Sequence, residues 1–283
     1  MPSPRHLIAA LALAAALPAA HAQQGVNLTA GPVDYTTWTL LGSAQASNFT
    51  PGNGFTYSVL DLTLPGSGDQ AGAAFAPAPL ALDFNQAFRF DFNWYIQGAP
   101  SDLRGDGLTF TLTTMPAVGG GGSDLGYAGQ HGSSVALAID TFHFENEPVS
   151  PSLQILAAGS NTPLTVFETG LGNSIREAQY QWFGSLAYTP SGQDDDTGLL
   201  VGEITNLDLG SFSVETPINF GALGLGLAGQ PVYYGFTASN GAAMDGHATS
   251  WGAAVPVPEP QTWLMLLAGL AAVGWMGHRR QRA

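Results

Sequence analysis

The chain has 283 residues, including 37 glycines and 19 prolines, and only 10% of its residues are charged. This length and composition are typical of one sandwich-sized domain with additional end segments. Its net charge of −14 argues against nucleic acid and anionic lipid as partners, because such a surface repels phosphate groups, so neutral partners or cations fit better. The absence of cysteine excludes disulfides and thiolate metal sites.

The first 22 residues have the layout of a secretory signal peptide. Arg5 and His6 form a basic start, residues 7–20 are an apolar run, and Ala20-His-Ala22 has the small residues of a cleavage site. The apolar run is short for a membrane span, which makes an uncleaved signal anchor the weaker alternative. We therefore expect an exported protein whose folded part begins near Gln23.

Residues 23–254 consist of short apolar or alternating runs separated by Gly, Pro, Asn and Asp, without an amphipathic helix. This pattern predicts an all-β domain. Residues 87–96 show it most clearly, since four aromatic residues there alternate with polar ones and predict a strand with one buried face. Many strands without a repeat of fixed period favour a two-sheet jelly-roll sandwich over a propeller. The expected strands lie near residues 55–64, 87–96, 108–113, 135–142, 164–167, 180–188, 199–205, 211–215, 232–238 and 248–253.

Two of these strands set a carboxylate beside alternating apolar residues, and a glycine-rich loop joins them. Asp106 precedes the first strand, whereas Asp140 lies within the second, where it needs a partner to offset its desolvation. The loop at residues 119–122 lacks the lysine and the following helix of a phosphate-binding loop, so we interpret it as a turn that allows close approach of a ligand. Together these features predict a binding site on a β scaffold.

The C-terminal segment, residues 255–283, has three parts in a fixed order. The tetrapeptide Val257-Pro258-Glu259-Pro260 comes first, residues 261–277 are uncharged, and an arginine-rich end follows. The apolar part is near the lower limit for a single transmembrane helix, with the basic end expected in the cytoplasm. The segment resembles the PEP-CTERM sorting signal, which implies export in a Gram-negative bacterium, processing by an exosortase-type enzyme at the inner membrane, and association with exopolysaccharide. An ordinary tail anchor after a proline-rich linker is the alternative.

Several segments between the two ends resemble, in order and spacing, the legume-type (L-type) lectin domain. The resemblance implies a concanavalin-like two-sheet sandwich over residues 23–254, with a sugar site in a shallow depression formed by loops. The matching segments are Leu60-Asp-Leu-Thr63, Ala71-Gly-Ala-Ala-Phe75, Phe88-Arg-Phe-Asp-Phe-Asn-Trp-Tyr-Ile96, Asp106-Gly-Leu-Thr-Phe110, Leu125-Gly126, Val135-Ala-Leu-Ala-Ile-Asp-Thr-Phe142 and Tyr234-Gly-Phe-Thr-Ala-Ser-Asn-Gly241, followed by His247 and Ser250-Trp251.

The resemblance assigns the sugar contacts by position. Asp106 matches the carboxylate that accepts hydrogen bonds from sugar hydroxyls, in a loop that often has a cis peptide before it. A rigid carboxylate can accept two hydroxyl donors, and charge-assisted hydrogen bonds are the stronger kind. A backbone N–H is expected from Gly122 or Ser123, and an aromatic platform from Phe142. The expected carbohydrate-binding set is Asp106, Gly122, Ser123, Phe142 and Asn146, together with Asn240 and Asp245 from a variable specificity loop.

The resemblance also implies a metal site, from which this chain departs. Ala138 replaces the family's Glu two residues before Asp140, so no transition metal is expected. The family's Asn falls at Phe144, with Asn146 available after a shift of two residues, and the family's His has no counterpart near Ser152. Calcium is the remaining candidate cofactor, because oxygen ligands suit that cation. Its expected ligands are Asp140, the Phe142 carbonyl and Asn146, with Glu145 or Glu147.

Each main candidate also has a purely structural interpretation. Asp106 lies in Gly-Asp-Gly, where it can form an Asx-turn. Asp140 can be a buried carboxylate satisfied by backbone N–H groups, and Phe142 can be a core residue.

The expected function is noncatalytic carbohydrate binding by an exported protein at the cell surface or in the exopolysaccharide matrix. The alternative is a structural matrix protein that keeps the lectin fold without a sugar site, and the missing metal ligands favour it. A glycoside hydrolase needs two carboxylates about 5 to 10 Å apart across a cleft. Because the close pair Glu145 and Glu147 lies in a proline-bounded loop, we do not expect an enzyme.

Overall fold

The computed structural model describes residues 24–50, 56–98, 105–130, 132–177, 181–193, 195–226 and 230–251. The expected signal peptide, the sorting motif at Val257–Pro260 and the C-terminal helix lie outside these residues. Within them, no helix has the length and apolar character needed to cross a membrane.

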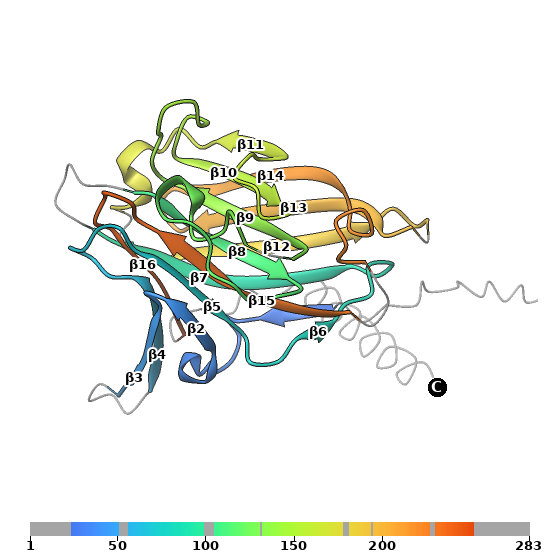
Figure 1. The fold of residues 1–283 in the computed structure, drawn as a ribbon, viewed down its shortest axis with the longest axis horizontal. Helices are drawn as coiled ribbons and strands as arrows, with labels where there is room; N and C mark the ends of the chain where they lie inside the picture. Colours follow the sequence, from blue (N-terminus) through green and yellow to red (C-terminus); the bar gives the residue numbers. More distant parts are fainter. Residues whose placement is uncertain are drawn as a thin grey trace, which may run out of the picture.

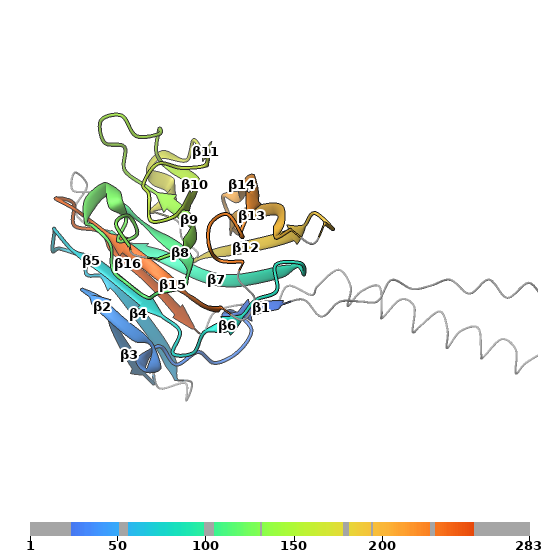
Figure 2. The same cartoon turned by 45° about the vertical axis from the view of Figure 1, so that its right-hand side comes forward.

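The described residues form two eight-stranded sheets. The two sheets lie against each other (Figures 1 and 2). Pairing is antiparallel except that β1 (Gln24–Asn27) runs parallel to β7. The first sheet has the order β14 (Gly210–Asn219), β13 (Thr197–Asn206), β12 (Trp182–Pro190), β7 (Phe88–Gln97), β16 (Gly246–Trp251), β4 (Tyr57–Thr63) and β3 (Gln45–Phe49). The second has the order β11 (Thr165–Glu168), β10 (Ser152–Ala157), β9 (Ser134–Asp140), β8 (Gly107–Thr113), β15 (Pro231–Ser239), β5 (Ala71–Phe75) and β2 (Thr39–Gly42), and β6 (Leu80–Ala81) pairs with β15.

The core between the sheets is largely aromatic. The four alternating aromatic residues of β7 are at most 1% exposed, and Phe92 stacks on Phe110 of the other sheet with ring centroids 4.5 Å apart. Burial of each such side chain contributes about 1.5–3 kcal/mol. The polar face of β7 is not wholly solvated, because Asn93 is buried and its side-chain oxygen accepts a hydrogen bond from the Thr249 hydroxyl (2.9 Å).

All ten expected strands are present, with shifted ends. The predicted strand over residues 135–142 was too long: β9 ends at Asp140, because the Thr141 N–H donates instead to the Asp106 carbonyl (2.8 Å). Six further strands were not predicted, namely β1, β2, β3, β5, β6 and β10. Both faces of β10 are buried, so it shows no alternation between apolar and solvent-facing residues.

The register of the second sheet decides which loops meet. Gly107 at the start of β8 pairs with Asp140 at the end of β9 and with Ser239 at the end of β15. The outward face of β9 is covered by the glycine-rich loop, whose Leu125 and Tyr127 pack in a small apolar cluster with Ala138. The loops before β8, after β9 and after β15 therefore meet the glycine-rich loop at one end of this sheet.

Candidate functional site

Backbone and side-chain hydrogen bonds tie these loops together. The Asp106 N–H donates to the Ser239 carbonyl (3.0 Å), and the Ser239 hydroxyl donates to the Gly122 carbonyl (2.5 Å). The Asp106 carbonyl accepts from both the N–H (2.8 Å) and the hydroxyl (3.1 Å) of Thr141. The backbone of Asp106 is thus held by β15 on one side and by the end of β9 on the other.

The carboxylate of Asp106 lies at the centre of this arrangement. A cis peptide bond joins Gly105 to Asp106, as the lectin resemblance implied. The residue is 7% exposed, and its Oδ2 atom is buried with no hydrogen-bond partner among the described residues. Burial, together with the smaller effect of the charge of Glu147, raises the pKa of this carboxyl to about 6.

Two glycines allow the neighbouring loops to approach the Asp106 carboxylate closely. A Cβ atom added at Gly241 would lie 2.7 Å from Oδ2 of Asp106 and 3.0 Å from the Cα atom of Gly122. Both glycines also have a positive φ, of +45° and +61°, which L side chains rarely adopt. Any larger residue at Gly241 would push the loop after β15 away from the site. Ser123 follows Gly122 in the short 3-10 helix η2 (Gly122–Asp124).

The second carboxylate, Asp140, is buried, and each of its two oxygens accepts a hydrogen bond. It is 5% exposed, its Oδ1 atom accepts from the Phe142 N–H (3.0 Å), and its Oδ2 atom accepts from Nε2 of Gln154 (2.9 Å). Burial raises the pKa of this carboxyl, and the hydrogen bond from the Phe142 N–H partly offsets that effect. The resulting pKa is about 7. Asp140 is therefore satisfied by one backbone N–H and one side-chain amide.

The loop after β9 presents aromatic rings to solvent. Phe142 is 39% exposed and Phe144 is 52% exposed, so neither is a core residue. A Cβ atom added at Gly105 would lie 2.8 Å from the Cβ atom of Phe142. The Phe142 side chain is therefore directly beside the cis peptide bond between Gly105 and Asp106. Asn146 lies exposed farther along the loop.

The expected calcium ligands do not include a cluster of acidic side chains among the described residues. Across the part of the chain that the structure describes, no three His, Asp or Glu side chains are grouped so as to hold a metal ion. Asn146 and Glu145 are exposed, and the Glu147 carboxylate accepts from the Phe144 N–H (2.9 Å). A calcium ion takes about six to eight oxygen ligands, so the donor set around Asp140 is incomplete for such an ion.

Asn240 and Asp245, both expected to contact sugar, are fully buried. The Asn240 amide accepts from the Gln70 N–H (2.9 Å) and donates to the carbonyls of Ser67 (2.6 Å) and Asp245 (3.1 Å). The structure therefore places both side chains behind the site, where they hold its loops, and not on the surface where a sugar would lie.

A buried ion pair supports the Gly105–Asp106 peptide from behind. Oδ2 of Asp245 accepts from the Gly105 N–H (3.1 Å) and pairs with the guanidinium of Arg176, whose side chain is 7% exposed. Arg176 follows the short 3-10 helix η3 (Gly172–Ile175). The sequence did not point to this role, because 69 positions separate the two partners. The one available signal was that Arg176 is among only three basic residues between the chain ends.

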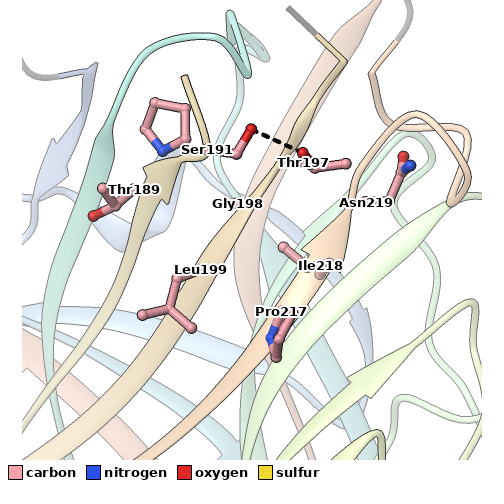
Figure 3. A pocket seen from close by; sticks show the side chains of 9 residues that line it. Thr189, Ser191, Thr197, Gly198, Leu199, Pro217, Ile218 and Asn219 are labelled. Atoms are coloured by element: carbon pink, nitrogen blue, oxygen red, sulfur yellow. Dashed lines mark hydrogen bonds between the residues drawn. The ribbon is translucent and has the colours of Figure 1, made fainter. Parts of the chain in front are cut away.

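A separate shallow depression lies on the first sheet, at the turn between β12 and β13 and beside the end of β14 (Figure 3). It is lined by Thr189, Pro190, Ser191, Thr197, Gly198, Leu199, Pro217, Ile218 and Asn219. The Thr197 and Ser191 hydroxyls are hydrogen-bonded to each other (2.9 Å), and none of the nine side chains is titratable. The depression offers no acid, base or charged group for chemistry.

Comparison with known proteins identifies the C-terminal motif. Residues 256–280 match the family model described as the PEP-CTERM protein-sorting motif. A motif of this kind indicates export and a location at the cell surface. No curated protein matches the chain.

Solved structures of plant lectins resemble the whole sandwich. Basic winged bean lectin with Tn-antigen has a TM-score of 0.60 and 20% identity, covering 76% of this chain and 91% of that one. The Bauhinia forficata lectin in complex with GalNAc has a TM-score of 0.59 and 18% identity, covering 79% and 95%. Lectin I-B4 from Griffonia simplicifolia, in a metal-free form, has a TM-score of 0.57 and 18% identity, covering 76% and 92%. These likenesses confirm the expected legume-lectin-like sandwich fold.

Proposed function

We propose that the protein is an exported, noncatalytic carbohydrate-binding protein whose site is centred on Asp106. One observation carries the proposal: Oδ2 of Asp106 is a buried carboxylate oxygen that accepts no hydrogen bond within the described part of the chain. A buried polar atom without a partner is costly, and buried polar atoms normally have one. A sugar hydroxyl is a neutral donor that can fill this position through a charge-assisted hydrogen bond.

The surroundings of Asp106 suit a neutral, hydroxyl-rich ligand. The exposed ring of Phe142 lies beside Gly105, the residue before Asp106, and offers an apolar surface for the face of a sugar ring. We expect the backbone N–H groups of Gly122 and Ser123 to add hydrogen-bond donors for the sugar. Because Gly241 and Gly122 close over Oδ2, a hydroxyl reaches that oxygen when these two loops move slightly apart. The net charge of −14 also favours neutral glycans over anionic ones.

The distribution of carboxylates supports a binding role without catalysis. The depression at the ends of β12–β14 has no acidic lining residue. Near Asp106, Asp140 is occupied by two N–H donors, and the Glu147 carboxylate accepts from the backbone of its own loop. A hydrolase requires one carboxyl group to deliver a proton and a second to act as base or nucleophile across the ligand.

The sorting motif supports a cellular location for the proposed binding activity. Residues 256–280 would be handled by an exosortase-type enzyme at the inner membrane, and the domain would then reach the cell surface. We propose that the site there binds glycans of the exopolysaccharide matrix.

A glycan array followed by calorimetry on the full-length protein tests the proposal. We expect binding of at least one neutral glycan, and we expect Asp106→Asn to weaken it at least about 100-fold, since it removes the charge from two hydrogen bonds. The matched control is Asp208→Asn, the same exchange on an exposed side chain in the β13–β14 turn. Absence of binding to any glycan, including the host's own exopolysaccharide, would favour a structural matrix protein.

A further inference from the structure

We propose that the glycan site works without a metal cation, because the side-chain amide of Gln154 does for Asp140 what a bound cation would do. The part of this proposal that concerns glycans rests on the proposed function. The part that concerns cation binding and folding stands on the described residues alone.

The register of β9 and β10 brings Gln154 into position. Asp140 lies opposite Ser152, and Ala138 lies opposite Gln154. Because Ala138 is small, the long side chain of Gln154 can extend along the sheet towards the neighbouring carboxylate. Gln154 and Ser152 are 3% and 0% exposed, so this contact is shielded from water.

The hydrogen bonds around Asp140 are made to the same carboxylate oxygens that a cation would bind. Nε2 of Gln154 donates to Oδ2 of Asp140 (2.9 Å) and to the Ser152 hydroxyl (3.0 Å). The Phe142 N–H donates to Oδ1 of Asp140 (3.0 Å). Each carboxylate oxygen therefore faces a positively polarised N–H group, which stabilises the carboxylate and repels a cation that approaches the same oxygen.

The loop after β9 is also closed by its own groups. The Phe144 N–H donates to the Glu147 carboxylate (2.9 Å), and the His143 ring nitrogen Nδ1 bonds the Pro148 carbonyl (3.0 Å). Since a carbonyl oxygen can only accept, Nδ1 carries the proton. These bonds, with the one from Phe142 to Asp140, set the path of the loop that presents the Phe142 ring. No oxygen cage is needed to shape it.

Thermal unfolding of the full-length protein tests cation independence directly. After treatment with EDTA, we expect calcium or manganese at about 5 mM to change the melting temperature by less than about 1 °C. Isothermal calorimetry with calcium chloride should show no saturable heat. A rise of several degrees with either ion, or saturable binding, would overturn the proposal.

Variants of Gln154 test whether the amide is the stabilising group. Gln154→Ala leaves Oδ2 of the buried Asp140 without its N–H donor and should lower the melting temperature by roughly 3–8 °C. Gln154→Glu should lower it further, because it places a second carboxylate beside the first. The matched control is Asn161→Asp, since the Asn161 amide also donates to an aspartate, Asp124 (3.0 Å), but at an exposed position where little change is expected. An unchanged melting temperature in Gln154→Ala would refute the role of the amide.

Glycan affinity provides an independent measurement. If a glycan binds, its affinity in EDTA and in calcium should agree within about two-fold. Loss of that affinity in EDTA would contradict cation independence while leaving the glycan function intact. If no glycan binds, the proposed function fails, whereas the melting data still decide whether the fold uses a cation.

Discussion

Asp106 and Asp140 lie at the same end of the second sheet, and they differ in one respect. Both are buried, at 7% and 5% exposure, and burial raises the pKa of both, to about 6 and about 7. Both oxygens of Asp140 accept an N–H donor, whereas Oδ2 of Asp106 accepts none among the described residues. Burial and a raised pKa therefore do not distinguish a binding group from a structural one. The hydrogen-bond partners of each oxygen do.

The largest expected effect comes from the support behind Asp106. Arg176→Ala breaks the buried ion pair with Asp245, so we expect a loss of about 3–5 kcal/mol in the free energy of unfolding, measured by urea denaturation. The matched control is Arg89→Ala, because Arg89 forms an ion pair with Asp91 at a half-exposed position (2.7 Å) and should cost less than about 1 kcal/mol. Equal losses in the two variants would show that the buried pair does not hold the Gly105–Asp106 peptide.

Replacement of each carboxylate by its amide should change stability in opposite directions. Asp106→Asn removes an unpaired buried charge, so we expect a gain of about 1 kcal/mol at pH 7 together with the loss of glycan binding. Asp140→Asn leaves one of two N–H donors without an acceptor, so we expect a loss of about 1–3 kcal/mol. Chemical denaturation of both variants checks the signs. Equal signs would remove the distinction between the two carboxylates.

The raised pKa of Asp106 makes glycan binding dependent on pH. The carboxyl must be ionised to accept two hydroxyl donors, so affinity should fall about tenfold for each pH unit below its pKa of about 6. Stability runs the other way: the folded pKa exceeds the unfolded value of 3.8, so the contribution of Asp106 is full below about pH 4 and is lost as the pH rises through about 6. Calorimetric titrations between pH 5 and 8 check the binding, and any residual binding by Asp106→Asn should not show this dependence.

The smallest expected effect concerns the aromatic platform beside Asp106. Phe142→Ala should weaken glycan binding about tenfold, because it removes an apolar surface for the sugar ring, and should change stability little since the side chain is 39% exposed. Phe144→Ala is the matched control, because its ring is more exposed, at 52%, and the Gly105 contact is made by Phe142. Comparable losses in both variants would show that Phe142 is not the specific platform.

Much of the fold could be predicted from the sequence. Some strands that are buried on both faces could not, because they show no alternation between apolar and solvent-facing residues. The alternation in β7 predicted that strand because one of its faces is aromatic and buried. β10 gave no such signal, since Ser152 and Gln154 are polar residues on a face that is also buried. Their burial is possible because the Gln154 amide donates both to the Ser152 hydroxyl and to Asp140, a partner on the neighbouring strand that no local pattern identifies.

The sequence by itself determined an all-β domain, its sorting motif, and Asp106 as the leading candidate for ligand contact. The first two conclusions depend on local patterns of apolar residues and on a short motif, which a linear chain displays directly, and the third depends on the resemblance to the L-type lectin domain. Only the tertiary structure showed that Asn240 and Asp245 are buried behind the site. It also showed that Arg176 forms an ion pair with Asp245 and that the Gln154 amide donates a hydrogen bond to Asp140. Such roles depend on which residues, distant in the sequence, become the hydrogen-bond or ion-pair partners of each buried charged group. These partners are brought together only when the strands pair in their register and the sheets form.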